Sequence, residues 1–256
     1  MPTVNRFGFF GQFIDNKGVD VILEALLILA RDKRIPPEGI VVEINGGNKH
    51  YATQAYLEKI TQYVEALKKV PTNLISVRER GSYDRPQLEE RMSSVDWVLV
   101  PSTWWEIFGL VVSEAWMFGR PVIASDIAAL GDRVQDGVNG FKFPARNAQA
   151  LADLMASLIG DEQQWLSVNA SIEPIWSDVD MLNGYVSIWQ EFKAERDGTS
   201  VEMAFATLPG ASPETPEPPP AEAVSAAALL AADKPAAEAP RPAVKKKSTR
   251  KARATA

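Results

Sequence analysis

The sequence has no cysteine and a single histidine, His50, which follows "GGNK" and is expected to lie in a loop. Without cysteine the chain can form neither a disulfide nor a thiolate zinc site, which fits a cytoplasmic protein. No stretch approaches the roughly 18 consecutive apolar residues of a membrane-spanning helix. The apolar segment Phe7–Phe10 is too short for a secretory signal. These absences exclude disulfide-stapled domains and proteins with a transmembrane helix.

Acidic residues outnumber basic ones, but the excess is unevenly distributed along the chain. Seven of the 27 basic residues lie within 240–256, which holds no acidic residue. The first 239 residues therefore carry 20 basic and 33 acidic side chains. An acidic body of this kind argues against strong nucleic-acid binding.

Short apolar segments alternate with helical patterns through the first 170 residues, in units of roughly 25 to 35 residues. This alternation predicts an α/β fold, a single Rossmann-like domain with a parallel sheet, and ligands at the carboxyl ends of its strands. The expected strands are 6–11, 39–47, 73–81, 96–102, 121–125 and 140–144. The expected helices are 19–31, 52–69, 86–93, 108–119, 147–160 and 161–170.

The composition changes after about residue 197, where the chain becomes rich in proline, alanine and charge. Such a segment has no face that can pack, so 197–256 is predicted to be a disordered tail with a basic end. Residues 1–176 are expected to form the Rossmann-like domain and 177–196 a C-terminal helix. Six apolar residues recur at helical spacing within 181–192 and require a cover, either this domain or another chain.

Two glutamates stand out in "PSTWWEIFGLVVSEAWMFGRPVIAS", residues 101–125. Glu106 precedes a helix expected to begin near Phe108, whose free amides and positive dipole end would attract phosphate. There Glu106 could cap the helix or accept hydrogen bonds from ligand hydroxyls. Glu114 lies further along the helix, where a carboxylate could hold both hydroxyls of a ribose diol. Spacing alone also permits two ordinary surface charges.

The same segment resembles the donor-site signature of GT4-type retaining glycosyltransferases of the GT-B fold. Their pattern is E-x7-E followed by G-x-P-V-I-A-S, and both parts occur here. "FGFFGQFIDNKGVDVILEAL" resembles that family's first strand, phosphate loop and helix, and "VQDGVNGFKF" its later turn. The resemblance covers about residues 6–195 and implies the C-terminal half of a GT-B enzyme, with residues 1–176 as its nucleotide-sugar donor-binding domain.

The resemblance also implies site residues, with neither a catalytic metal nor a cofactor. Glu106 would steady the transferring sugar, and Lys17 would pair with the diphosphate, both as catalytic residues. The implied donor-binding residues are Gly11, Gln12, Phe108, Gly109, Leu110, Glu114 and Tyr83, the last near the nucleotide base. Gln12 departs from the family, which often has arginine at this position, so binding of the diphosphate would depend more on Lys17. Arg78 or Arg80 could compensate, or be ordinary strand-end charges.

The GT-B acceptor domain normally precedes the donor domain, and only five residues stand before the first strand here. The resemblance therefore implies metal-independent, retaining transfer from a nucleoside-diphosphate sugar to an unknown acceptor. It implies that an N-terminal acceptor domain is missing, either because a partner chain carries it in a split enzyme or because the chain is a truncated gene product. A sugar-nucleotide-binding or interaction module without transferase activity remains an alternative. A GT-B epimerase is a weaker one, because the E-x7-E run favours transfer.

Overall fold

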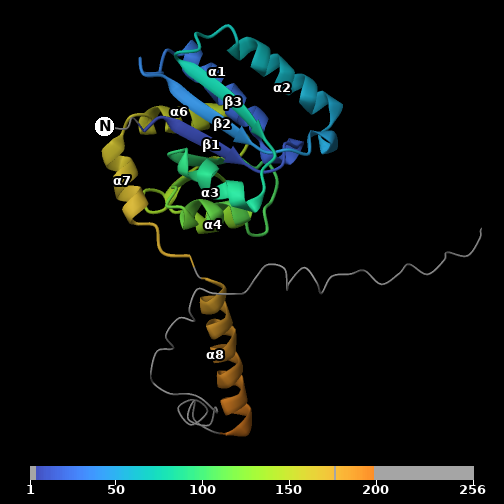
Figure 1. Ribbon diagram of the computed structural model, residues 1–256, viewed down its shortest axis with the longest axis vertical. Coiled ribbons are helices and arrows are strands. Elements are labelled where there is room, and N and C mark those ends of the chain that lie inside the picture. The colour runs from blue at the N-terminus through green and yellow to red at the C-terminus, as the bar shows by residue number, and fades with distance from the viewer. Residues whose placement is uncertain (1–3, 176, 199–256) are drawn as a thin grey trace, which may run out of the picture. The chain divides into compact units, whose positions relative to one another are not determined.

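The computed structural model of the protein describes residues 4–175 and 177–198 (Figure 1). Residues 4–175 hold the α/β unit, and 177–198 contain the last helix. The predicted disordered tail, 197–256, lies outside the described residues apart from its first two, and Asp197 is the last residue of that helix.

Six parallel strands form one sheet in the order β3-β2-β1-β4-β5-β6. Each predicted strand is present, so the expected α/β class and Rossmann-like sheet are confirmed. The strands are β1 (Arg6–Phe10), β2 (Ile40–Asn45), β3 (Ile75–Gly81), β4 (Trp97–Val100), β5 (Val122–Asp126) and β6 (Gly140–Pro144).

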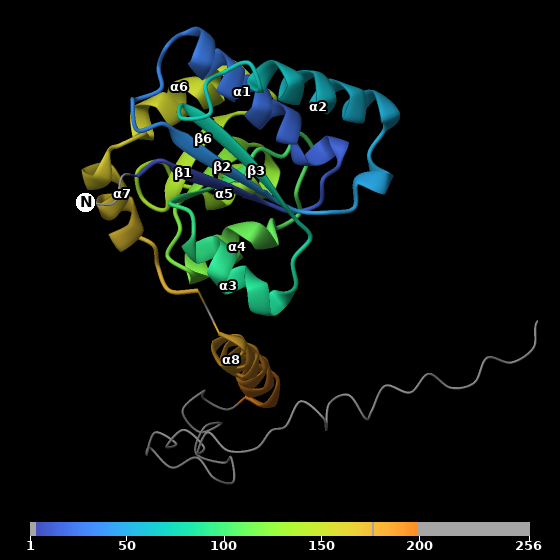
Figure 2. The ribbon, with the colours of Figure 1, turned by 45° about the horizontal axis from the view of Figure 1, so that its top comes forward.

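Helices cover both faces of this sheet (Figures 1 and 2). One layer contains α1 (Val19–Arg31), α2 (Gln54–Leu67) and α6 (Ala148–Leu158), and the other contains α3 (Arg85–Ser93) and α4 (Leu110–Met117). The remaining described helices are α5 (Ala128–Arg133), α7 (Glu162–Ala170), α8 (Asp178–Asp197) and the 3-10 turns Asp15–Lys17 and Lys49–Tyr51.

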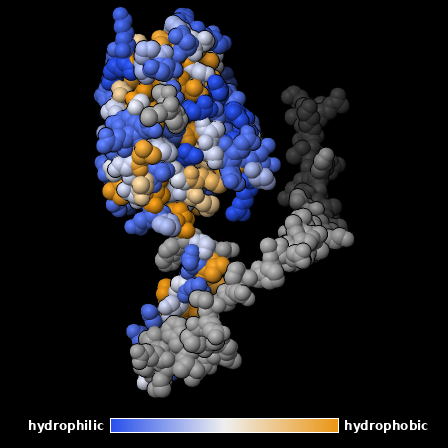
Figure 3. All heavy atoms as spheres, turned by 60° about the vertical axis from the view of Figure 1, so that its left-hand side comes forward, coloured by the Kyte–Doolittle hydropathy of each residue, from blue (hydrophilic) through white to orange (hydrophobic). Residues whose placement is uncertain are grey.

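The strands supply two hydrophobic cores because successive side chains point to opposite faces. In β4, Trp97 and Leu99 join the core beneath α1, α2 and α6. Val98 and Val100 join the second core, which includes α4 and Leu130 of α5. Polar residues, in blue, cover much of the visible face of the α/β unit in Figure 3, with apolar patches between them. Burial on both faces explains why these strands are continuously apolar rather than alternating.

Two helices differ from the sequence prediction. The helix expected at 108–119 begins only at Leu110, because Gly109 has a left-handed φ of 72° and serves as its N-cap. Helix α5 was not predicted. It has only six residues, and Gly131 interrupts it, so it carries no recognisable apolar repeat.

Helix α8 crosses the boundary between the α/β unit and a second unit that begins at Ser187. The apolar side chains predicted to need a cover are exposed, from 51% for Met181 to 66% for Tyr185. The complete set is Met181, Leu182, Tyr185, Ile188, Trp189 and Phe192. The proposed domain division at residue 176, and a surface that covers these side chains, stay predictions.

Membrane-spanning helices and clustered metal ligands are both absent from the part of the chain that the structure describes. No helix there combines the length and the apolar character needed to cross a bilayer. The same residues contain no group of three or more histidine, aspartate or glutamate side chains placed to hold a metal ion.

Candidate functional site

The strand order reverses direction between β1 and β4, which lie side by side at the centre of the sheet. In open parallel sheets a crevice forms at such a point, outside the carboxyl ends of the strands. The loops that leave β1 and β4, residues 11–18 and 101–109, therefore emerge next to each other. They carry most of the site residues expected from the sequence.

Close backbone contacts hold these two loops together. A Cβ atom on Gly18 would lie 1.9 Å from the Pro101 carbonyl oxygen, so only glycine fits this contact, and its φ of 73° also favours glycine. The Thr103 amide donates a hydrogen bond of 2.9 Å to the Asn16 carbonyl. These contacts bring together side chains that are far apart in the sequence.

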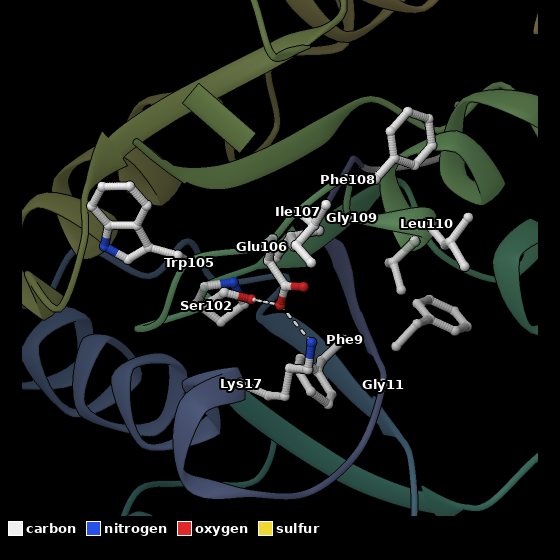
Figure 4. A pocket seen from close by; sticks show the side chains of 14 residues that line it. Phe9, Gly11, Lys17, Ser102, Trp105, Glu106, Ile107, Phe108, Gly109 and Leu110 are labelled. Carbon is white, nitrogen blue, oxygen red and sulfur yellow. Dashed lines mark hydrogen bonds and ion pairs between the residues drawn. The ribbon is translucent and has the colours of Figure 1, made fainter. Parts of the chain in front are cut away.

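Lys17 and Glu106, 89 positions apart, meet at this junction (Figure 4). The Lys17 ammonium donates a hydrogen bond to Glu106 Oε1 and forms an ion pair with it. The Ser102 hydroxyl donates to the same oxygen at 2.9 Å. The sequence analysis left open whether Glu106 caps the following helix. No side chain caps α4, so the structure favours a carboxylate turned toward the lysine and the pocket.

A pocket of about 430 Å³ opens above this pair. It contains both expected catalytic residues and four of the expected donor-binding residues, Gly11, Phe108, Gly109 and Leu110. The full lining is Phe9, Phe10, Gly11, Lys17, Val100, Pro101, Ser102, Trp105, Glu106, Ile107, Phe108, Gly109, Leu110 and Val111.

The N-terminus of α4 forms one wall of this pocket. The left-handed φ of Gly109 turns the chain into the helix, and a Cβ there would lie 2.8 Å from Leu130. The helix starts without a side-chain cap, and its first residues, Leu110 and Val111, line the pocket. Uncapped amides and the positive end of the helix dipole favour an anion at this wall.

Arg133 of α5 anchors this wall, and the sequence analysis missed it. Its guanidinium donates to the carbonyls of Phe108 at 2.7 Å and Gly109 at 3.1 Å, and to Ser113 Oγ at 2.7 Å. It also lies 3.9 Å from the centre of the Phe108 ring. Burial lowers the pKa of the Arg133 guanidinium. Arg133 belongs to no motif and lies in a helix that the sequence did not predict, so nothing in the sequence indicated this role.

Tyr83 and Glu114 lie beside the pocket rather than among its lining residues. The Tyr83 ring meets Phe10, which does line the pocket, edge to face at 5.8 Å. Burial and the charge of Glu114 raise the pKa of Tyr83 to about 12, against the opposing effect of Arg91. Burial also raises the pKa of Glu114, against the opposing effect of Arg85. The two side chains are therefore close enough to interact electrostatically.

Arg91 fixes the loop that carries Tyr83, and the sequence analysis did not single it out. It is buried and donates to the carbonyls of Gly81 at 3.0 Å and Ser82 at 3.1 Å. Its guanidinium lies 5.5 Å from the centre of the Tyr83 ring. A buried arginine inside a polar helix gives no periodic pattern that would identify it.

Other residues considered from the sequence lie elsewhere. Gln12 is exposed and does not line the pocket, so its proposed donor contact stays a prediction. Arg78 and Arg80 lie 3.7 and 3.5 Å from the buried carboxylate of Glu43 and form ion pairs with it. They are also absent from the pocket lining. His50 is exposed, and it lies in the 3-10 turn Lys49–Tyr51 rather than in an irregular loop.

Comparison with known proteins matches residues 4–161 to the family described as "Glycosyl transferases group 1". A D-inositol 3-phosphate glycosyltransferase from Nocardia farcinica is 32% identical over 160 residues, which is 61% of this chain and 33% of that protein. The chain spans between 33% and 46% of the length of the first four curated relatives that it matches.

Solved structures show the same fold. Anabaena HepE in complex with UDP-glucose superposes with a TM-score of 0.55 at 25% identity, over 65% of this chain and 42% of that one. The C-terminal domain of the group 1 family protein LpcC from Francisella tularensis gives a TM-score of 0.54 at 22% identity, over 67% of this chain and 83% of that domain. The chain therefore belongs to the group 1, GT4-type glycosyltransferases, and its α/β unit has the fold of a GT-B C-terminal domain.

Proposed function

We propose that this chain is the donor-binding part of a retaining, metal-independent glycosyltransferase that uses a nucleoside-diphosphate sugar. The observation that carries the proposal is the meeting of Lys17 and Glu106 in one pocket beside the uncapped start of α4. A cation and free amides suit a diphosphate, and a carboxylate suits sugar hydroxyls. A cytoplasmic location, expected from the lack of cysteine, also stays a prediction.

Each part of the site then has a separate task. Lys17 and the first amides of α4 would bind the diphosphate and stabilise charge on the leaving group. Glu106 would accept hydrogen bonds from the transferring sugar. Glu114 would hold the ribose hydroxyls, and Tyr83 would contact the nucleotide base. HepE, which has the same fold, binds UDP-glucose, and this supports a sugar nucleotide as the ligand.

The proposal includes a further domain that binds the acceptor. The first four curated relatives are more than twice as long as the part that this chain matches. We propose that transfer requires that additional region, supplied in the same polypeptide or by a partner chain. The acceptor itself stays unidentified.

A titration with sugar nucleotides tests donor binding. Trp105 lines the pocket, so its fluorescence should change when UDP-glucose, GDP-mannose or ADP-glucose binds. The Trp105→Phe variant is the control, because it removes this reporter and leaves the other six tryptophans. A calorimetric titration of the wild type and of Trp105→Phe then checks that the variant still binds the sugar nucleotide although its fluorescence change is lost. If none of the three compounds binds the wild-type chain, the proposal is wrong.

Glu114→Gln is expected to weaken nucleotide binding by about 1.5–3 kcal/mol, roughly tenfold to a hundredfold. The amide keeps the shape of the side chain but loses the charge that strengthens hydrogen bonds from the ribose hydroxyls. Calorimetry with UDP and with 2′,3′-dideoxy-UDP measures this effect. The variant should discriminate between the two ligands less than the wild type does. Equal discrimination by both proteins would rule out the ribose contact.

The same substitution should leave the fold slightly more stable at neutral pH. Burial raises the pKa of Glu114, so the folded state binds its proton more tightly than the unfolded state does. The wild type therefore loses stability as the pH rises through the unfolded pKa of this carboxyl, and the amide does not. Because the side chain is only partly buried and water screens its charge, the gain should stay below about 1 kcal/mol. Melting temperatures at about pH 4 and pH 7 measure it, and a variant less stable at pH 7 would contradict it.

Lys17→Ala is expected to weaken UDP binding roughly tenfold to a hundredfold, while uridine affinity changes by less than about twofold. Only the diphosphate carries the charges that the ammonium would contact. Lys68→Ala is a matched control, since Lys68 is the C-cap residue of α2 and forms an exposed ion pair with Glu65. Equal losses for UDP and uridine would indicate a structural role for Lys17.

A further inference from the structure

Ser102 is a buried hydroxyl at the base of the pocket, and the proposed function gives it no task. Its residue is only 2% exposed, and it follows β4 directly after Pro101. The neighbouring Thr103 is fixed on both sides, because its amide donates to Asn16 and its carbonyl accepts from Arg146 at 3.1 Å. The hydroxyl is therefore held in place by the backbone that carries it.

This hydroxyl and the Lys17 ammonium share one oxygen of Glu106. Ser102 Oγ donates to Oε1 at 2.9 Å, and Lys17 donates to the same atom. The other oxygen, Oε2, makes no hydrogen bond to the described part of the chain, and Figure 4 shows it turned away from both partners. Anchoring one oxygen leaves the other one available to a ligand in the pocket.

Binding of the sugar nucleotide would affect Ser102 and Lys17, the two hydrogen-bond partners of Glu106, differently. If Lys17 pairs with the diphosphate, its ammonium must weaken or leave the bond to Glu106. The carboxylate would then lose the only cation that contacts it among the described residues. Ser102 is neutral and buried, so the diphosphate does not compete for its hydroxyl. Its hydrogen bond can persist through binding and keep Glu106 in one orientation.

We infer that Ser102 is a positioning residue, which keeps Glu106 directed at the donor sugar once Lys17 has turned to the diphosphate. This inference rests on the proposed function. It predicts a selective defect: without the hydroxyl, contacts to the sugar weaken, while contacts to the nucleotide remain. A residue that only supports the fold would affect both ligands alike.

The test compares UDP and UDP-glucose binding to the wild type and to Ser102→Ala by calorimetry. Ser102→Ala should bind UDP within about twofold of the wild type and UDP-glucose about tenfold more weakly, which is ~1.4 kcal/mol. Ser102→Thr keeps a hydroxyl and should recover most of the loss. Ser102→Cys is close in size but a weak donor, so it should behave like alanine and replaces it if alanine does not fold.

A double-mutant cycle shows whether Ser102 acts through Glu106. In a Glu106→Ala background, adding Ser102→Ala should change UDP-glucose affinity by less than about twofold, because the group to be positioned is gone. An undiminished tenfold loss in that background, equal losses for UDP and UDP-glucose, or wild-type affinity for UDP-glucose in Ser102→Ala would each overturn the inference alone. Failure of the wild type to bind either compound would instead overturn the proposed function.

Discussion

The purified chain is expected to bind UDP-glucose but to transfer glucose at least about 10⁵-fold more slowly than the same chain joined to an acceptor-binding domain. Holding two reactants in line can supply about 7–11 kcal/mol of barrier reduction. Closure of a cleft around the donor also excludes water from the reacting carbon. Under the proposed function the pocket supplies groups for the sugar nucleotide alone, so a further domain would make both contributions.

A fusion to the N-terminal region of the Nocardia farcinica relative provides the comparison, with inositol 3-phosphate as acceptor. Product formation by the chain alone and by the fusion is measured at saturating donor, and Glu106→Ala in the fusion is the control for chemistry at this site. Efficient transfer by the chain alone would contradict the need for a further domain. Tight donor binding with no transfer in any fusion would favour the alternative, a sugar-nucleotide-binding module.

Gly18→Ala is expected to destabilise the fold by about 2–5 kcal/mol and to weaken UDP binding at least tenfold. The new Cβ would stand 1.9 Å from the Pro101 carbonyl oxygen, which belongs to the backbone and cannot rotate away. The left-handed φ of 73° adds a strain of about 1–2 kcal/mol for any residue with a Cβ. Overpacking contributes about 1–3 kcal/mol more. Relief of the clash requires the loops after β1 and β4 to separate, which pulls Lys17 away from Glu106.

Gly137→Ala separates these two causes. Gly137 has a similar φ of 76°, but a Cβ there would meet no atom within 4 Å. It should therefore show the backbone strain alone and lose about 1–2 kcal/mol, with unchanged UDP affinity. Urea unfolding gives both free energies, and calorimetry gives both affinities. Equal effects of the two substitutions would show that the contact between the loops does not hold the site together.

Much of the fold followed from local patterns. Strands such as "DWVLVPS" and "PVIAS" are short apolar runs bounded by polar residues, proline or glycine, and their alternation with helices limits the chain to a parallel sheet. Helix α5 could not be predicted in this way. Its six residues take their helical form from the packing of Leu130 into the second core rather than from a repeat of their own.

The candidate site likewise combines residues that the sequence predicted with contacts that it did not. The sequence alone determined the family through its ordered motifs, and with it the nomination of Lys17 and Glu106. Only the tertiary structure decided that Lys17 and Ser102 donate to the same oxygen of Glu106, that Arg133 fixes the turn at Phe108 and Gly109, and that Gln12 lies outside the pocket. The physical reason is that a motif records which residues stand in a segment. Contacts between segments depend on how the strand order places the loops after β1 and β4 side by side, across 89 positions of sequence.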